Sequence, residues 1–271
     1  MRNRYYGIFK DIFDLYEDEI KELSIYEGCF ADYYDMFDAD SKELEFYLSQ
    51  ARLCGRDVLE LCCGNGRITI PLAMSGFHVY GYDLSGDMLR KLEIRKNRLP
   101  KSLQKNIHTF REDIFLINSS RQYDFICLPA TTICILAEDE NLLVDLFRKV
   151  YALLKNDGSF VFDIREGYQD GQRCCSKISS LKQCTSHSTS LTLIQEFNHY
   201  VVGRSIANFY TQIEYIDGHK EKYIAYADKK IIPRVWLEKI IANARFFILN
   251  ENTVKHDGFT ETYFVLKKNS F

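Results

Sequence analysis

The most constraining feature of this chain is the stretch Val58–Arg67, which reads Val-Leu-Glu-Leu-Cys-Cys-Gly-Asn-Gly-Arg. Its apolar start predicts a buried strand, and its two glycines predict a tight turn into a helix that continues through Ala73. A second apolar strand over 77–82 leads to the carboxylate of Asp83. A strand, a glycine turn, a helix and a second strand in this order form a nucleoside-binding crevice at the carboxyl edge of a parallel sheet.

The alternation of strands and helices continues along the chain. Helices separate five predicted strands, which lie at 57–61, 77–82, 106–110, 123–128 and 159–164. This pattern is typical of an α/β fold with a doubly wound, Rossmann-like sheet and right-handed crossovers. After a helix that Pro233 opens, two last strands at 246–250 and 260–267 are expected to form the antiparallel edge. The whole is predicted to be a seven-stranded, mostly parallel sheet.

Two further segments flank this predicted core. Residues 1–54 are expected to form an N-terminal helical lid, with one amphipathic helix over 5–23, a break at Gly28 and a second helix over 41–53. Residues 166–232 are expected to form an inserted antiparallel β cap on the substrate side. Its first part, to residue 190, is polar and is predicted to be a long loop, and three strands follow at 191–202, 206–216 and 222–231. The core then comprises 55–165 and 233–271.

Composition and charge exclude several classes of protein. A hydrophobic fraction of 46% is typical of a folded chain, and a net charge of -3 argues against a nucleic-acid binder. The nine cysteines include no Cys-x-x-Cys pair, so neither a disulfide framework nor a metal site is predicted. No apolar run is long enough for a membrane span, and no signal peptide is evident at the start of the chain. We therefore expect a cytoplasmic protein without a membrane partner, either a monomer or a homodimer.

The residues around the glycines discriminate between nucleotides. A dinucleotide fingerprint needs a third glycine three residues after Gly66, where this chain has Thr69, and no Walker lysine follows the turn. Glu60 at the end of the first strand would repel phosphates but would attract an ammonium group. A ligand that joins an amino acid to a nucleoside without phosphates fits better, and S-adenosyl-L-methionine is such a ligand.

The glycine turn and four further motifs, in order and at the right spacing, resemble class I S-adenosylmethionine-dependent methyltransferases over about residues 30–165. Beyond the glycine turn, the matching stretches are Gly81–Leu89 after the second strand, Arg111–Ile114, Asp124–Pro129 and Gly158–Asp163. The one departure is Cys62, where this family usually has a glycine. We expect a small cysteine to be tolerated there, provided that the position does not require a positive φ.

The resemblance implies the following roles in cofactor binding. Glu60, Cys62 and the backbone of Gly64 and Gly66 would hold the methionine end, with Arg67 on the carboxylate. Asp83 would accept hydrogen bonds from both ribose hydroxyls. The remaining implied contacts are Leu84, Met88, Asp113 and Ile114 at the adenine, the Leu128 carbonyl near the ammonium group, and Tyr34 of a Tyr34-Asp35 pair that closes over the cofactor. The product would be S-adenosyl-L-homocysteine.

Candidate residues for the acceptor side follow from position in the predicted fold. Asp163 at the end of the fifth strand, with Arg165 just beyond, is the best-placed candidate for catalysis or substrate contact. Tyr16 of the lid, Tyr168 of the loop and His199 of the cap are further candidates for substrate contact. From the sequence alone, an ordinary structural role fits each of these residues as well as contact with a substrate does.

The sequence limits the chemical class of the methyl acceptor but does not identify it. The acidic lid favours a cationic acceptor, and relatives with this arrangement resemble N-methyltransferases that act on amines of small molecules or peptide natural products. The size and the acidic, aromatic N-terminal helix resemble the plantazolicin N-methyltransferases, which dimethylate the terminal amine of an azole peptide beginning with arginine. A small-molecule O-methyltransferase would share every motif, and it would be favoured if a histidine or lysine base faced the methyl group. A non-catalytic nucleoside-binding module is the other alternative.

Overall fold

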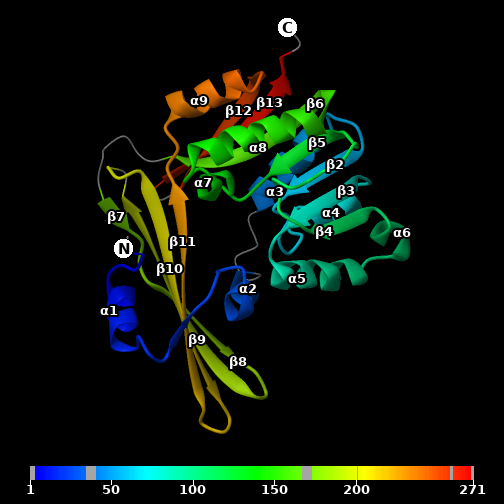
Figure 1. Ribbon diagram of the computed structural model, residues 1–271. Coiled ribbons are helices and arrows are strands. Elements are labelled where there is room, and N and C mark those ends of the chain that lie inside the picture. The colour runs from blue at the N-terminus through cyan, green and yellow to red at the C-terminus, as the bar shows by residue number, and fades with distance from the viewer. Residues whose placement is uncertain (1–3, 35–40, 167–172, 200, 257–258, 270–271) are drawn as a thin grey trace.

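The computed structural model describes residues 4–34, 41–166, 173–199, 201–256 and 259–269. They form two β-sheets (Figure 1). One sheet has seven strands and forms the core, and the other has six strands and forms the cap. Among the described residues, no helix is both long and apolar enough to cross a membrane.

The core sheet has the predicted doubly wound arrangement. Its strand order is β12-β13-β6-β5-β2-β3-β4, parallel from β6 to β4, with β13 antiparallel to both of its neighbours. The seven strands are β2 (Asp57–Leu61), β3 (His78–Asp83), β4 (Ile107–Arg111), β5 (Tyr123–Leu128), β6 (Leu154–Glu166), β12 (Phe246–His256) and β13 (Phe259–Lys268). The predicted strands and the antiparallel edge are therefore confirmed.

Helices cover both faces of this sheet, which is why its central strands are apolar throughout. One face packs on α3 (Ser41–Ala51), α4 (Thr69–Met74) and α5 (Gly86–Asn97), with the short α6 (Lys101–Gln104) beside α4. The other face packs on α7 (Ile133–Leu136), α8 (Glu140–Leu153) and α9 (Arg234–Asn243). Ser85 caps α5 by accepting a hydrogen bond from the Met88 amide, and Pro233 precedes α9 as predicted.

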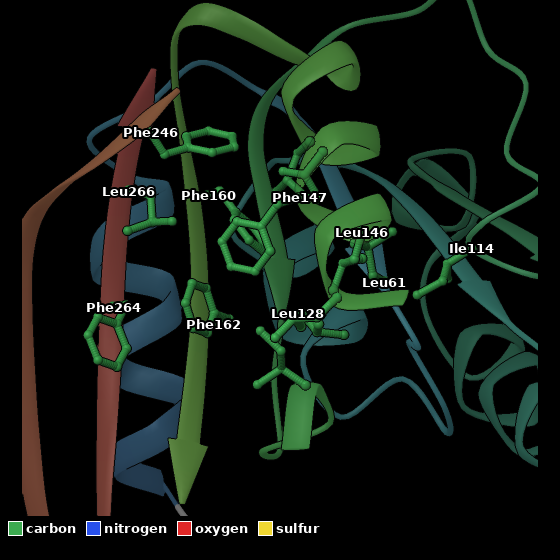
Figure 2. Close-up of a cluster of buried hydrophobic side chains, with 14 of the residues drawn as sticks. Leu61, Ile114, Leu128, Leu146, Phe147, Phe160, Phe162, Phe246, Phe264 and Leu266 are labelled. Atoms are coloured by element: carbon green, nitrogen blue, oxygen red, sulfur yellow. The ribbon is translucent and has the colours of Figure 1, made fainter. Parts of the chain in front are cut away.

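Aromatic side chains fill the layer between α8 and the sheet (Figure 2). The Phe147 ring from α8 lies edge-on to Phe160 and Phe162 of β6, with centroid distances of 5.7 and 5.6 Å. All three side chains are fully buried. Burying one such side chain contributes about 1.5–3 kcal/mol, so this layer holds the sheet and its helices together.

The cap sheet extends away from the core as long strands (Figure 1). Its strands are β1 (Ile20–Glu22), β7 (Arg173–Cys175), β8 (Ser179–Cys184), β9 (Ser188–His199), β10 (Arg204–Tyr215) and β11 (Lys220–Lys230). The order is β1-β11-β10-β9-β7, and β8 also pairs with β9. The three predicted strands and their turns are confirmed, since Gly203 and Gly218 both have positive φ.

The prediction of a long loop up to residue 190 was wrong. Residues 173–175 and 179–184 pair antiparallel with β9, and β9 itself begins at Ser188. The polar composition was misleading because β8 lies at the edge of the sheet, where most of its side chains are exposed. Exposed edge strands lack the apolar alternation by which a strand is predicted.

The prediction of one helix over 5–23 was also wrong. The helix α1 covers only Ile8–Leu15, and residues 20–22 form β1, which pairs parallel with β11. Acidic residues at 17–19 would lie at the carboxyl end of a longer helix, where the helix dipole disfavours negative charge. Pairing with β11 satisfies the backbone instead. Gly28, which was expected only to end a helix, begins α2 (Gly28–Tyr34).

Candidate functional site

The loop between β2 and α4 is built on left-handed backbone conformations. Cys62, Gly64 and Gly66 have φ of 56°, 52° and 83°. A Cβ on Gly66 would lie 2.7 Å from Cγ of Leu92, so only glycine fits there. The expectation that Cys62 does not need a positive φ was wrong: it adopts the conformation that favours the glycine usual in the family. The same turn is therefore formed here with a cysteine, for which a positive φ costs more energy than it does for glycine.

Asp83 joins this loop to the end of β3. Its two carboxylate oxygens accept hydrogen bonds from the Gly64 and Ser85 amides, each at 2.8 Å. Burial raises the pKa of Asp83, while the amide bonds act in the opposite direction. The parallel pairing of β2 with β3 places the two loops side by side, so the carboxylate lies next to the glycine loop.

Two tyrosines of the N-terminal segment lie over this carboxylate. The Tyr26 and Tyr34 rings are 5.9 Å apart, and the Ser85 hydroxyl donates to the Tyr26 carbonyl at 2.6 Å. Burial raises the pKa of Tyr26, and the nearby charges of Tyr34, Cys62 and Asp83 act in the same direction. The sequence indicated Tyr34 but missed Tyr26, whose only signal was its place in an aromatic stretch.

Hydrogen bonds tie α2 to the core beneath it. The Gly28 amide donates to the Asp87 carboxylate at 2.7 Å, and Lys91 pairs with Asp32 at 2.5 Å. Both core partners belong to α5, the helix that begins next to Asp83. These two contacts hold α2 of the lid against α5, next to Asp83. Asp35, the partner predicted for Tyr34, lies outside the described residues.

The predicted adenine contacts lie on the segments that follow β3 and β4. Met88 and Ile114 are buried, whereas the Leu84 side chain is 64% exposed. One Asp113 oxygen accepts from the Phe115 amide at 2.9 Å, which orients the carboxylate. Leu128, whose carbonyl was expected near the ammonium group, ends β5.

Glu60 and Arg67 lie beneath the loop and both have protein partners. The Glu60 carboxylate is buried and accepts from the Thr69 hydroxyl, and burial raises its pKa to about 8. Arg67 forms a two-pronged ion pair with Glu43. Glu43 also accepts from the Ala130 amide at 3.1 Å. Sequence reasoning missed Glu43, because nothing in α3 marks it as a buried carboxylate.

Asp163 is fully buried and organises the loop after β5. It accepts from the Tyr47 hydroxyl at 2.6 Å and from the Thr131 amide. Burial and the neighbouring Glu43 raise its pKa well above the usual value. Ala130 and Thr131 have φ of 64° and 52°, so these bonds hold a strained turn in place. These contacts favour a role for Asp163 in holding the loop in place rather than in contacting a substrate.

A cavity of about 170 Å³ lies between the lid, the core and the cap. The lid contributes aromatic side chains, the core contributes the loop after β5 and the end of β6, and the cap contributes one face of β9, β10 and β11. The lining residues are Ile25, Tyr26, Phe30, Tyr33, Tyr34, Ala130, Arg165, Glu196, Ser205, Ala207, Phe209, Ala227 and Lys229. Tyr26 and Tyr34 therefore border both this cavity and the crevice at Asp83.

Arg165 and Lys229 are the cations of this cavity. Arg165 donates to the Ser205 hydroxyl at 2.6 Å and lies 3.4 Å from the Glu196 carboxylate. Lys229 donates to the Ala130 carbonyl at 3.1 Å and to the Thr131 hydroxyl. Burial lowers the pKa of Lys229. The sequence indicated Arg165 but missed Lys229, since either lysine of the pair at 229 and 230 could have faced inward.

The other residues predicted for the substrate side are not among the described residues that line the cavity. Tyr16 ends α1, and the Lys222 ammonium group lies 4.1 Å from its ring centroid. His199 ends β9, where its ring accepts from the Val202 amide at 3.3 Å. Tyr168 lies outside the described residues.

A larger open groove of about 1510 Å³ adjoins the cavity and lies between the N-terminal lid, including α1, and the cap. The two share Ile25, Tyr26 and Ala227. Acidic side chains line the groove together with aromatic ones, among them Asp14 and Glu22. The groove therefore offers a route from solvent to the cavity. The described residues contain no group of three or more His, Cys, Asp or Glu side chains arranged to hold a metal ion.

Residues 58–158 match a protein-family model described as a methyltransferase domain. Two curated relatives are provisionally named as methyltransferases. One, GWCH70_2453 of Geobacillus sp. (strain WCH70), is 27% identical over 114 residues, and the other, YqeM of Bacillus subtilis (strain 168), is 29% identical over 119 residues. These matches cover 42% and 41% of this chain, and 44% and 43% of the relatives' own lengths.

Solved structures resemble the chain over nearly its whole length. The sugar N-methyltransferase KedS8 from Streptoalloteichus sp. ATCC 53650 has a TM-score of 0.70 at 16% identity, covering 99% of this chain and 98% of that one. An S-adenosylmethionine-dependent methyltransferase from Clostridium acetobutylicum ATCC 824 has a TM-score of 0.66 at 18% identity, covering 90% and 100%. The glycopeptide N-methyltransferase MtfA with S-adenosyl-L-methionine has 0.57 at 12%, covering 96% and 97%.

Residues 58–158 thus match a methyltransferase domain, and the chain shares the fold of solved S-adenosylmethionine-dependent methyltransferases. The predicted resemblance is confirmed at this level. The narrower likeness to the plantazolicin N-methyltransferases stays a prediction.

Proposed function

We propose that this protein transfers the methyl group of S-adenosyl-L-methionine to an amine of a small molecule or peptide natural product. The observation that carries the proposal is the junction of two spaces at Tyr26 and Tyr34. On one side is the crevice with the Asp83 carboxylate and the left-handed glycine loop. On the other side is the cavity closed by the cap.

The crevice residues fit this cofactor. Each Asp83 oxygen has a lone pair beyond the one engaged by a backbone amide, so the carboxylate can also accept from ribose hydroxyls. Gly64 and Gly66 allow the left-handed turn that brings the loop to Asp83. Met88 and Ile114 form an apolar wall for the adenine, and Asp113 has an oxygen for its amino group.

When bound, the cofactor supplies an electrophilic methyl group on a sulfonium. The protein has to align the acceptor with it and keep water out, and good alignment alone is worth about 7–11 kcal/mol. The aromatic lid residues Tyr26, Phe30, Tyr33 and Tyr34 close the junction from one side. Phe209 of the cap contacts the lid, with its ring 6.1 Å from that of Phe30. Aromatic faces also stabilise a cationic sulfonium.

The choice of an amine acceptor draws support from the fold likeness to sugar and glycopeptide N-methyltransferases. A protonated amine must lose a proton before it can accept the methyl group. Glu196 is the one carboxylate among the described residues that line the cavity, and it accepts one long contact, from Arg165. The terminal amine of an azole peptide beginning with arginine is the specific acceptor that we propose to test first.

Lys229 supports a second candidate, a small-molecule O-methyltransferase. Its amine lies in the cavity wall and burial lowers its pKa, which is the condition for a lysine to act as a base toward a hydroxyl. Lys229→Arg separates the roles, because arginine keeps the charge but cannot act as a base near neutral pH. Loss of methyl transfer in Lys229→Arg with unchanged acceptor binding would favour the O-methyltransferase.

Two measurements test the proposed function. Titration calorimetry should detect binding of S-adenosyl-L-methionine and S-adenosyl-L-homocysteine and no binding of NAD, and binding of NAD alone would contradict the proposal. Mass spectrometry of amine and hydroxyl acceptors, including the desmethyl azole peptide, should reveal gains of one or two methyl units. Cofactor binding without transfer to any acceptor would favour a non-catalytic nucleoside-binding module.

A further inference from the structure

The cavity beside the crevice contains more positive than negative side chains. Arg165 and Lys229 line it, and Glu196 is the one carboxylate among its described lining residues. Arg165 is only 7% exposed, while the Glu196 side chain is 36% exposed and lies 3.4 Å from the guanidinium. The acid that could offset the two cations is therefore partly exposed to water, which weakens its attraction for them.

Arg165 also has a buried nitrogen with no partner among the described residues. Its Nη1 donates to Ser205 and its Nη2 faces Glu196, and the flat guanidinium lies 3.7 Å from the Phe259 ring centroid. Its Nε atom is buried without a hydrogen bond. A buried charged donor without a partner costs on the order of 1–3 kcal/mol or more, so a fold keeps one only when something else occupies it.

Lys229 presents a second incompletely neutralised donor to the same space. Its described partners, the Ala130 carbonyl and the Thr131 hydroxyl, are uncharged and take up two of its three N–H groups. The charge of Arg165 is close enough to act on Lys229 in the direction that opposes protonation. The charges of Asp163 and Glu196 act on Lys229 in the opposite direction, but no carboxylate among the described residues forms an ion pair with it. The cavity lining therefore combines two cations with one partly exposed carboxylate.

We propose that the acceptor carries a carboxylate, which binds in this cavity to Nε of Arg165 and to the ammonium group of Lys229. The proposal deepens and rests on the proposed methyltransferase function. Two donors on two sides match the two oxygens of a carboxylate, whereas a phosphate needs more donors than the cavity offers. The aromatic remainder of the lining fits an apolar body next to that carboxylate, with the methylated group toward Tyr26.

The test uses the full chain saturated with S-adenosyl-L-homocysteine and three probes: 3-phenylpropionate, 3-phenylpropionamide and phenyl phosphate. Calorimetry should show that the carboxylate binds and that the uncharged amide binds at least about tenfold more weakly, since a lost charged hydrogen bond has this effect. Lys229→Met should weaken binding of 3-phenylpropionate by at least about tenfold, and Arg165→Gln should do the same.

Lys230→Met is the matched control. It removes the same charge one residue away, from a side chain that lies 4.6 Å from the Trp236 ring on the other face of β11, and it should leave probe binding unchanged. Equal binding of acid and amide, equal effects of the two lysine variants, preference for phenyl phosphate, or no binding of any probe would each overturn the proposal. Failure of the wild-type chain to bind S-adenosyl-L-homocysteine would instead contradict the proposed function.

Discussion

The core sheet and the cap sheet form their halves of the candidate site in different ways. The crevice in the core is formed by loops that follow neighbouring parallel strands, and its main contacts come from backbone amides and one carboxylate within residues 58–114. The cavity under the cap is formed by side chains from α2, the end of β6 and three cap strands. Recognition of a common cofactor can therefore rest on local backbone geometry, while recognition of an acceptor rests on distant side chains.

The two halves also differ in charge. The core side contains the Asp83 and Asp113 carboxylates, and the glycine loop bonded to Asp83 is strained. The cavity presents Arg165 and Lys229. This difference predicts that substitutions in the two sheets will change different measured quantities.

The largest expected effect comes from truncating the aromatic layers of the two sheets. Phe147→Ala should lower the free energy of unfolding by about 3–5 kcal/mol, because the fully buried ring packs on β6. Phe197→Ala removes a ring from the cluster between β9, β10 and α1. We expect it to loosen the cap and weaken acceptor binding while leaving affinity for S-adenosyl-L-homocysteine unchanged.

Urea unfolding and calorimetry measure the two quantities. Leu191→Ala, on a cap side chain that is 42% exposed, is the control and should change neither. If Phe197→Ala weakened cofactor binding as much as acceptor binding, the core and cap halves of the site would not act independently.

Asp83→Ala should weaken cofactor binding by about a hundredfold or more. The variant removes an acceptor for the ribose and also frees the Gly64 and Ser85 amides, and two charge-assisted bonds account for that factor. Asp57→Ala removes an acid from the start of β2, at the opposite edge of the sheet, and should have little effect on calorimetric affinity. Equal affinity of Asp83→Ala and the wild type would exclude the ribose assignment.

The stability of the core should fall as pH rises between about 4.5 and about 8 because of Glu60. Burial raises the pKa of Glu60 to about 8 in the folded chain from an ordinary value of 4.5, so over this interval the folded state holds a proton that the unfolded state has lost. Its stabilising contribution is present below pH 4.5 and is lost as pH approaches 8. Glu60→Gln should flatten this slope in urea unfolding measured across pH, and an unchanged slope would show that Glu60 is ionised when folded.

The smallest expected effect concerns the strained turn. Cys62→Gly should change the free energy of unfolding by no more than about 1 kcal/mol, because relief of a left-handed conformation offsets the flexibility that glycine adds to the unfolded chain. Cys62→Val should lower it by about 2 kcal/mol, since a branched side chain fits that conformation poorly. If valine were tolerated as well as glycine under urea, the turn would not impose the positive φ.

Much of the core and of the crevice could be predicted from sequence because the signals are local. The strand ending in Glu60, the glycine turn, the strand ending in Asp83 and the Ser85 cap each occupy a few consecutive residues. The left-handed φ of Cys62 was mispredicted, because a cysteine carries no signal for that conformation. The edge strands β1, β7 and β8 were missed for a related reason: their pairing partners, not their own composition, make them strands.

The sequence by itself determined the parallel core, the glycine turn and the two acids that suit an adenosyl cofactor, since each depends on residues close together in the chain. Only the tertiary structure decided which side chains line the cavity. In β11 the register pairs Lys229 with Ser205 and so places Lys229, rather than Lys230, on the face of Arg165. A shift of one residue would exchange the two lysines, because successive side chains of a strand point to opposite faces. That register is fixed by the pairing of β11 with β10 across the turn at Gly218, and neither lysine by itself indicates which of the two faces Arg165.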